Sequence, residues 1–181
     1  MRIVGGEFRG RRLASVGKGD AAAHLRPTSD RVRESLFNIL GSYGVIEGAH
    51  VLDLFAGTGA LGLEALSRGA ERATFVESGR AGQKLLGENI ALCRAEDRTQ
   101  VLARDARRIG TGMLNDLIFL DPPYGKALGE AALDAAMAGG WLAPGALVVW
   151  EENVEVAAPA GLSLQDERRY GDTVIRIFTL D

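Results

Sequence analysis

The sequence predicts an α/β fold with a mostly parallel sheet of seven strands that ends in an antiparallel hairpin. Apolar, strand-like runs alternate with helical patterns through the body of the chain, an order typical of a parallel sheet with helices on both faces. The last two strand-like runs flank Gly171-Asp172, a turn that joins antiparallel strands. The expected strands are residues 50–55, 73–77, 99–103, 117–121, 146–150, 162–170 and 173–180, and the expected helices of the body are 60–68, 79–93 and 128–138.

The N-terminal part of the chain carries its own elements ahead of this body. Residues 1–25 are expected to form a small basic hairpin and a loop, and residues 26–44 a helix that leads into the core. The segment Pro27-Thr28-Ser29-Asp30 supplies capping residues for the start of that helix. With residues 45–181 as the catalytic core, the whole chain is expected to be one domain that buries roughly 70 per cent of its unfolded surface.

Composition indicates a cytoplasmic protein without a membrane segment. The one cysteine, Cys93, excludes an internal disulfide and suits a reducing compartment, and its place in a helical pattern makes it a core residue. No apolar run is long enough to span a bilayer, and the amino terminus is polar and basic. The two histidines, His24 and His50, have no neighbouring cysteine or paired histidine, so we expect no metal site.

Charge is distributed unevenly along the chain, although the net charge is only −3. Residues 1–33 carry eight basic and three acidic side chains, a balance of +5, which leaves −8 for the remainder. This asymmetry predicts a basic arm that binds RNA on an acidic catalytic body. The alternative is an ordinary solvated surface, and the glycine-rich setting of the arm favours RNA. The arginines expected to contact RNA are Arg9, Arg11, Arg12, Arg26, Arg31 and Arg33.

The tetrapeptide Asp121-Pro122-Pro123-Tyr124 follows the apolar run Leu117-Ile118-Phe119-Leu120. It therefore lies at the carboxyl end of a buried parallel strand, where open α/β sheets bind ligands. Two consecutive prolines stiffen the loop. The loop offers a carboxylate, a backbone carbonyl and an aromatic face, which suit a planar amine on a ring. A purely structural Pro-Pro turn is the alternative, and the glycine loop upstream weighs against it.

A glycine-rich loop, Gly57-Thr58-Gly59-Ala60-Leu61-Gly62, joins an expected strand to an expected helix. Glycines at this turn let a nucleotide-type cofactor approach the backbone, and the start of the helix offers free N–H groups. Glu77 closes the next strand, 20 residues after Gly57, where a carboxylate can accept hydrogen bonds from two ribose hydroxyls. By itself, this loop fits a dinucleotide as well as it fits S-adenosylmethionine.

Further acidic residues favour S-adenosylmethionine over a dinucleotide. Asp53 lies inside the strand, where a carboxylate would crowd a pyrophosphate but could serve the ammonium-bearing methionine end. Asp105 follows the strand expected at 99–103, where its side chain can reach the adenine amine. Acidic residues at successive strand ends, without a lysine to neutralise a pyrophosphate, indicate a cationic cofactor. The residues expected to bind it are Asp53, Phe55, Ala56, Gly57, Thr58, Gly59, Glu77, Asp105 and Ala106.

The site motifs together resemble those of class I S-adenosylmethionine-dependent methyltransferases that act on exocyclic amines of bases. Two N-terminal stretches are more specific, because they resemble the RsmD family. These stretches are MRIVGGEFRGRRL at residues 1–13 and RPTSDRVRESLFNIL at residues 26–40. The resemblance runs from residue 1 to residue 173, and it implies the Rossmann-like class I methyltransferase fold.

The RsmD family methylates the N2 amine of one guanine in bacterial 16S ribosomal RNA. The resemblance therefore implies this activity, with S-adenosylmethionine as cofactor and 16S rRNA of the small ribosomal subunit as partner. Asp121 and the Pro122 carbonyl would accept the two N–H bonds of the amine, and Tyr124 would stack on the guanine. The guanine would be unpaired or flipped out of its helix. The expected catalytic residues are Asp121, Pro122, Pro123 and Tyr124.

Other functions stay open at this point. An enzyme of the same fold could methylate adenine N6 in DNA or a protein glutamine, although many such enzymes carry Asn at the position of Asp121. They also bring a target-recognition insertion, for which this chain has no room. The intact site motifs argue against a non-catalytic RNA-binding assembly factor. A dehydrogenase is the third alternative, and a cofactor-binding assay would distinguish it from a methyltransferase. Outside the site, Trp141 and Trp150 are expected to pack against the sheet. Glu151 and Glu152, at the end of another strand, are expected to be surface acids, with a place in the lining of the cleft as the alternative.

Overall fold

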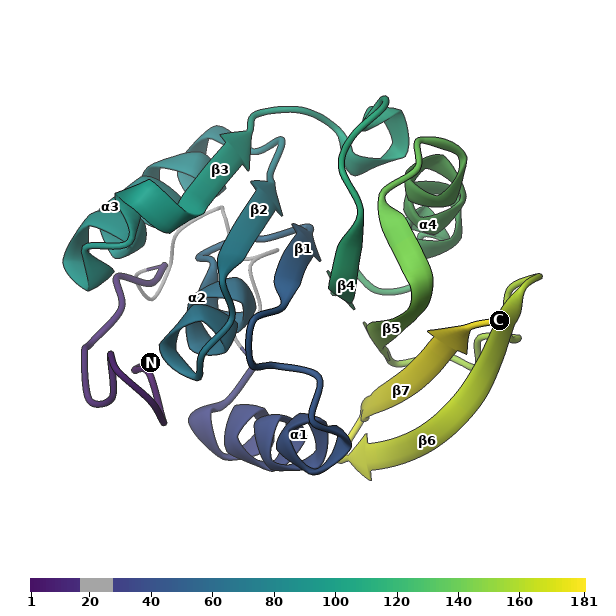
Figure 1. Cartoon of the computed structure of the whole chain (residues 1–181), viewed down its shortest axis with the longest axis horizontal. Coiled ribbons are helices and arrows are strands. Elements are labelled where there is room, and N and C mark those ends of the chain that lie inside the picture. Colours follow the sequence, from purple (N-terminus) through teal and green to yellow (C-terminus); the bar gives the residue numbers. More distant parts are fainter. Residues whose placement is uncertain (17–27) are drawn as a thin grey trace.

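A seven-stranded sheet organises the chain, with the strand order β3-β2-β1-β4-β5-β7-β6 (Figure 1). The computed structural model describes residues 1–16 and 28–181. Strands β1 to β5 run parallel, whereas β7 pairs antiparallel with both β5 and β6. This confirms the predicted α/β class and the C-terminal antiparallel hairpin. The strands are β1 (His50–Leu54), β2 (Arg72–Val76), β3 (Thr99–Leu102), β4 (Asn115–Leu120), β5 (Leu142–Glu152), β6 (Leu162–Tyr170) and β7 (Thr173–Leu180).

Helices cover both faces of this sheet, as the alternation of elements predicts. The α-helices are α1 (Asp30–Tyr43), α2 (Ala60–Ser67), α3 (Arg80–Cys93) and α4 (Leu128–Ala138), and two short 3₁₀ turns are η1 (Glu96–Arg98) and η2 (Ala106–Arg108). Helices α1, α2 and α3 share one hydrophobic cluster with the sheet, and α4 and η2 share the cluster on the opposite face (Figure 1).

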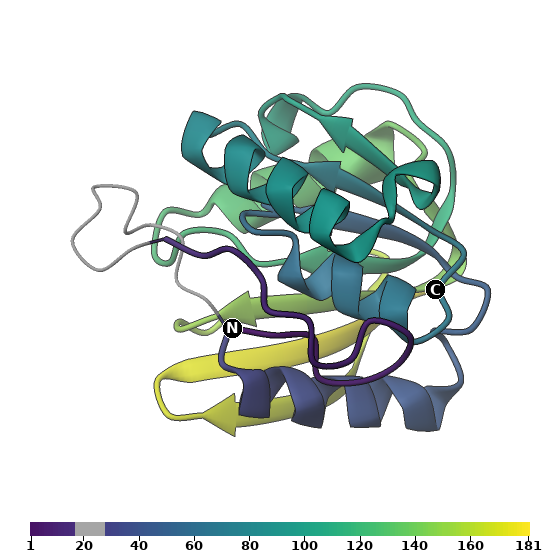
Figure 2. The same ribbon diagram turned by 90° about the vertical axis from the view of Figure 1, so that its left-hand side faces the viewer.

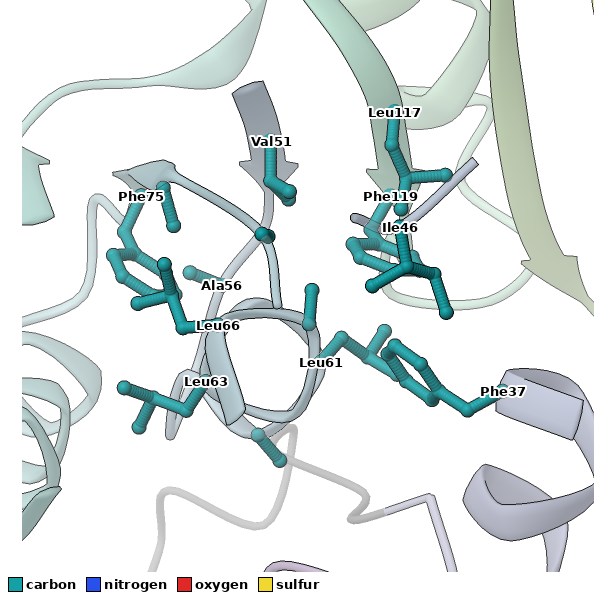
Figure 3. Packing of buried hydrophobic residues seen from close by; sticks show 14 of the residues in the cluster. Phe37, Ile46, Val51, Ala56, Leu61, Leu63, Leu66, Phe75, Leu117 and Phe119 are labelled. Carbon is teal, nitrogen blue, oxygen red and sulfur yellow. The ribbon is translucent and has the colours of Figure 1, made fainter. Parts of the chain in front are cut away.

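Strand β4 shows why the central strands read as continuous apolar runs. Leu117 and Phe119 point into the cluster of α1 and α2, where Phe119 lies 5.7 Å from Phe37 between ring centroids (Figure 3). Ile118 and Leu120 point to the opposite face, into the cluster of α4. Each such side chain contributes about 1.5–3 kcal/mol when it is removed from water. Burial on both faces thus fixes β4 and, with it, the position of the loop that follows.

Helix α1 begins and ends at residues that satisfy its terminal backbone groups. The Ser29 hydroxyl accepts a hydrogen bond from the Val32 N–H, as the predicted capping segment requires. At the other end Gly44 has φ +67°, a left-handed conformation that glycine adopts without steric cost. The buried face of the helix, which includes Leu36, Phe37 and Leu40, packs against the sheet.

The N-terminal hairpin is packed on the body rather than extended from it. One antiparallel bridge, Arg2 to Arg12, closes it, and Ile3, Phe8 and Leu13 are buried in the core. Two backbone N–H groups bond Ser67 at the end of α2: Phe8 donates to its hydroxyl at 2.8 Å and Glu7 to its carbonyl at 2.7 Å. Figure 2 shows this segment lying beside α1 and α2. The small basic hairpin that the sequence predicts is therefore part of the packed body.

Strand β5 is longer than the expected 146–150. A proline near its start interrupts the strand-like sequence pattern, so the prediction began too late. Asn115 pairs with Leu142 and Leu117 with Leu147, so β5 carries an irregularity around Pro144 that the ladder accommodates. At its other end, Glu151 and Glu152 are 9% and 4% exposed. They are not surface acids, because β5 lies between β4 and β7 in the interior of the sheet.

The remaining sequence expectations for the core agree with the structure. Trp141, Trp150 and Cys93 are all buried. The bounds of α4, β6 and β7 coincide with the predicted residues 128–138, 162–170 and 173–180. Within the described ranges, no helix is long and apolar enough to cross a membrane.

Candidate active site

A cavity of about 670 Å³ opens at the carboxyl ends of the central strands. This volume is in the range of small-molecule and cofactor sites. The cavity is bordered by the loops after β1, β2, β3 and β4, which is where open α/β sheets hold ligands. Its lining includes all four predicted catalytic residues and every predicted cofactor residue except Gly59. These are Asp53, Phe55, Ala56, Gly57, Thr58, Glu77, Asp105, Ala106, Asp121, Pro122, Pro123 and Tyr124.

Close packing explains the glycines of the first loop. Gly59 has φ +79°, and a Cβ on it would lie 2.5 Å from the Leu86 side chain. A Cβ on Gly62 would lie 2.4 Å from the Phe75 ring, so only glycine lets α2 pack this close to β2. Phe55, the residue after β1, also has a positive φ, +59°, which is uncommon for a bulky side chain. The turn from β1 into α2 is thus held in one tight conformation.

Asp53 lies beneath this loop, buried, and its Oδ2 accepts a hydrogen bond from the Gly62 N–H at 3.0 Å. The carboxylate thereby caps the first turn of α2, where the helix dipole favours negative charge. The pKa of Asp53 is raised from 3.8 to about 8, chiefly by burial; the Gly62 N–H opposes this rise and the negative charge of Glu77 adds to it. A cation placed beside Asp53 would favour its ionised form.

Glu77 is fixed at the end of β2 by two backbone donors. Its Oε2 accepts from the Gly57 N–H at 2.7 Å, and its Oε1 accepts from the Gly79 N–H at 2.8 Å. A Cβ at Gly82, in the first turn of α3, would lie 2.8 Å from its carboxyl carbon. The carboxylate therefore links the glycine loop to the start of α3 at the wall of the cavity.

Asp105 has a partner that sequence reasoning missed. It caps η2 by accepting from the Arg107 N–H at 2.9 Å, and the Arg107 guanidinium lies 2.6 Å from its Oδ2. The hydrogen bond from that guanidinium holds the pKa of Asp105 below its usual value. Arg104, Arg107 and Lys126 also line the cavity, so its charge is mixed rather than purely acidic.

The tetrapeptide forms the wall of the cavity after β4. Pro122 is buried, and the Tyr124 hydroxyl donates to Glu151 Oε1 at 2.7 Å and lies 3.0 Å from Thr173 Oγ1. Burial raises the pKa of the Tyr124 phenol, as does the negative charge of Glu151, so the group is a neutral donor. Sequence reasoning missed Glu151, since nothing local marks an acid that binds a tyrosine 27 residues away.

The predicted RNA-binding arginines fall into different environments. Arg9, Arg12 and Arg31 are exposed. Arg11 is half-buried, donates to the Cys93 carbonyl at 2.7 Å and lies over the Phe8 ring, so it fastens the hairpin to α3. Arg26 lies outside the described residues.

Arg33 was wrongly predicted to contact RNA. Its side chain is fully buried, with Nε 3.3 Å from Glu64 and Nη2 2.9 Å from Asp30. It also donates to the backbone carbonyls of Arg2 and Thr28. Glu64, fully buried as well, accepts from the backbone N–H groups of Val4 and Gly5. Arg33 therefore joins α1 to α2 and to the hairpin.

The donor set of the cavity suits S-adenosylmethionine. Carboxylates of Asp53, Glu77 and Asp121 face a cavity of nucleoside-binding size, which matches a ligand with a cationic sulfonium and ammonium. In the described part of the chain, no three His, Cys, Asp or Glu side chains cluster as a metal site would require.

Comparisons with known proteins identify the family. The model of the family described as "Conserved hypothetical protein 95" matches residues 1–179. The chain is 40% identical to "Ribosomal RNA small subunit methyltransferase D" of Escherichia coli (strain K12), over 98% of this chain and 89% of the relative. It is 34% identical to the protein of the same name from Haemophilus influenzae, over 98% and 93% of the two chains.

The solved structures agree with the sequence relatives. The structure of "Putative methyltransferase yhhF from Escherichia coli" superposes with a TM-score of 0.87 and 41% identity, covering 100% of this chain and 98% of that one. The fold, the site motifs and the relatives thus all indicate a methyltransferase. The chain belongs to the family described as "Conserved hypothetical protein 95", the RsmD family of class I methyltransferases.

Proposed function

We propose that this chain transfers a methyl group from S-adenosylmethionine to the N2 amine of a guanine in 16S rRNA of the small ribosomal subunit. The observation that carries the proposal is the position of the Asp121–Tyr124 loop on the wall of the cavity that also holds Asp53, Glu77 and Asp105. The names of the relatives, ribosomal RNA small subunit methyltransferases, support the substrate class. A ribosomal substrate places the activity in the cytoplasm.

The cofactor supplies an electrophilic methyl group, so the protein has to bind both partners and align them. Glu77 accepts hydrogen bonds from the ribose hydroxyls, Asp53 binds the ammonium of the methionine end, and Asp105 accepts from the adenine amine. Backbone groups of the loop from Phe55 to Gly59, together with Ala106, surround the remaining surface of the cofactor.

The tetrapeptide prepares the guanine amine for attack. The lone pair of a base amine is delocalised into the ring, which makes the nitrogen a poor nucleophile. Asp121 and the Pro122 carbonyl accept the two N–H bonds and favour a pyramidal nitrogen whose lone pair points to the methyl group. Pro123 keeps the loop stiff, and Tyr124 stacks on the base, a contact worth about 1–3 kcal/mol. In the mechanism we propose, Asp121 orients the amine and takes its proton after transfer.

The RNA meets the protein through exposed cations near the N-terminus. Arg9, Arg12 and Arg31 are exposed, and Arg31 lies in the first turn of α1. We assign phosphate contacts to these three side chains, and Arg26 remains part of the same proposal. The affinity for RNA should then fall as salt is raised, since phosphate contacts release counterions.

The test is methyl transfer from labelled S-adenosylmethionine to 30S particles that lack the modification, followed by nucleoside analysis. Wild-type protein is compared with Asp121→Ala and with Asp134→Ala, a control on the exposed side of α4. We expect N2-methylguanosine with the wild type and the control, and its loss in Asp121→Ala with cofactor affinity preserved. Cofactor binding without labelled RNA would contradict the ribosomal substrate and direct attention to adenine or glutamine amines.

A further inference from the structure

We propose that Glu151 is a positioning residue, which fixes the position of the Tyr124 ring and ties it to the start of helix α1. The inference rests on the proposed function, because it assigns a role in base alignment to a side chain that touches neither cofactor nor base. It concerns a buried carboxylate that is not among the residues lining the cavity.

The two oxygens of Glu151 accept hydrogen bonds from different elements. Oε1 accepts from the Tyr124 hydroxyl at 2.7 Å, and Oε2 accepts from the Thr28 hydroxyl at 2.9 Å. The side chain sits near the carboxyl end of β5 and is only 9% exposed. A carboxylate withdrawn from water in this way needs partners, and charge-assisted hydrogen bonds from two hydroxyls supply them.

The phenol end of Tyr124 is where the catalytic loop is anchored to the sheet. Its hydroxyl meets Glu151 on β5 and Thr173 at the start of β7, so two neighbouring strands hold it. The chain after the ring is loosely packed: a Cβ at Gly125, which has φ +71°, would meet no atom within 4 Å. With the hydroxyl fixed, the sheet determines where the phenol end of the ring lies.

Thr28 connects the Glu151 carboxylate to the start of α1, where Arg31, a proposed RNA contact, also lies. Its carbonyl accepts from Arg33 Nη1 at 3.3 Å, so Thr28 is held from both sides, by Glu151 and by the buried arginine of α1. Exposed Arg31 lies in the first turn of that helix. Through these hydrogen bonds, Glu151 holds the Tyr124 ring, which we propose stacks on the base, at a fixed position relative to the start of α1, which carries the proposed phosphate contact Arg31.

Kinetics on the unmodified 30S particles separate positioning from binding. In Glu151→Ala we expect kcat to fall about tenfold, which corresponds to about 1.4 kcal/mol of activation free energy, because the ring loses its charge-assisted hydrogen bond. KM for the particle should change less than about twofold, because the base is still bound but poorly aligned. The affinity for S-adenosylmethionine should stay unchanged. Glu151→Gln should retain most of the activity, because its amide oxygen accepts from Tyr124 and its amide N–H donates to Thr28.

A double-mutant cycle identifies the partner through which Glu151 acts. Tyr124→Phe keeps the ring and removes the hydroxyl, so adding Glu151→Ala to it should cost almost nothing more. Glu155→Ala, an exposed acid four residues further along, is the matched control and should match the wild type. Full additivity of the two substitutions, or a Glu151→Ala effect on cofactor affinity as large as on kcat, would overturn the assignment.

A structural readout keeps this inference separate from the choice of substrate. The chain has three tyrosines, so ¹³C-labelled tyrosine gives few ring resonances, and Tyr124→Phe assigns the relevant one. In Glu151→Ala we expect the Tyr124 ring signals to shift and broaden, with those of the other two tyrosines unchanged. Unaltered Tyr124 signals contradict the inference whatever the substrate is, whereas a wild-type protein that methylates no RNA contradicts only the proposed function.

Discussion

Asn89 of α3 donates a hydrogen bond to the backbone carbonyl of Thr58 at 2.9 Å, and so braces the glycine loop from behind. The same side chain binds the backbone of Ala14 twice, accepting from its N–H at 2.7 Å and donating to its carbonyl at 3.0 Å. Asn89 is fully buried. One amide thus connects the N-terminal segment to the loop that we assign to the cofactor.

Replacing this amide is expected to weaken both folding and cofactor binding. Asn89→Ala removes three hydrogen bonds from part-buried backbone groups of Ala14 and Thr58, so the free energy of unfolding should fall by about 1–3 kcal/mol. The Gly57–Gly59 loop loses its brace, and the affinity for S-adenosylmethionine should fall with it. Urea denaturation and titration calorimetry measure the two effects. Glu88→Ala, an exposed neighbour on α3, is the control and should change neither.

The buried pair of Arg33 and Glu64 is expected to matter for stability rather than for RNA. Arg33→Ala leaves the buried Glu64 carboxylate with Arg68, 2.9 Å away, as its remaining charged partner, so the unfolding free energy should fall by about 3 kcal/mol, the lower end of the range for a broken buried pair. The N-terminal hairpin should loosen first, since Glu64 accepts from the N–H groups of Val4 and Gly5. Hydrogen exchange at those two amides checks this. Continued protection of both in the variant would show that the hairpin is held by its apolar side chains alone.

The sequence predicted the sheet well because most of its strands have a clear residue pattern. Central strands buried on both faces are continuous apolar runs, as in Leu117 to Leu120, and the turn at Gly171-Asp172 marks the final hairpin. The position of the candidate site followed from the same pattern, since Asp53 lies in a strand and Glu77 and Asp121 each follow one directly. Strand β5 was cut short most, where Pro144 interrupts the pattern, and the predicted start of β4 at residue 117 omits Asn115 and Asp116.

What the sequence could not predict is which polar side chains turn inward. Charge counts placed Arg33 with the RNA-binding arginines, although its helix position directs it to Glu64 in α2. Glu64 did carry a signal, as a lone acid within the apolar stretch Leu61-Gly62-Leu63-Glu64-Ala65-Leu66. Glu151 carried none, because its partners Thr28 and Tyr124 come near it only through the tertiary fold.

Replacing Arg31 is expected to weaken RNA binding but not stability, the opposite of replacing Arg33, although both residues lie on α1. Its side chain is exposed, so Arg31→Ala should change the free energy of unfolding by no more than about 0.5 kcal/mol. The variant should bind the 30S particle more weakly, and the slope of log K against log salt should become shallower by roughly one unit for one lost phosphate contact. Filter binding over a salt series measures this slope. An unchanged slope would remove Arg31 from the RNA-binding surface.

Asp53 is expected to make stability depend on pH. The pKa of this carboxyl is 3.8 in the unfolded reference and is raised to about 8 in the folded protein, mainly by burial. Between these values the folded state holds a proton that the unfolded state has released. The contribution of Asp53 to the free energy of unfolding is therefore greatest below the lower value and is lost progressively as pH rises toward 8.

Asp53→Asn isolates this effect, because the amide does not titrate and its oxygen still accepts from the Gly62 N–H. The difference in unfolding free energy between wild type and variant should shift in favour of the variant as pH is raised from about 5 to about 8. Asp134→Asn, an exposed control, should show a pH-independent difference. A difference that stays constant for Asp53→Asn would mean that the carboxyl remains ionised in the fold. The same variant should bind S-adenosylmethionine more weakly at pH above about 8, where the wild-type carboxylate is charged and attracts the ammonium.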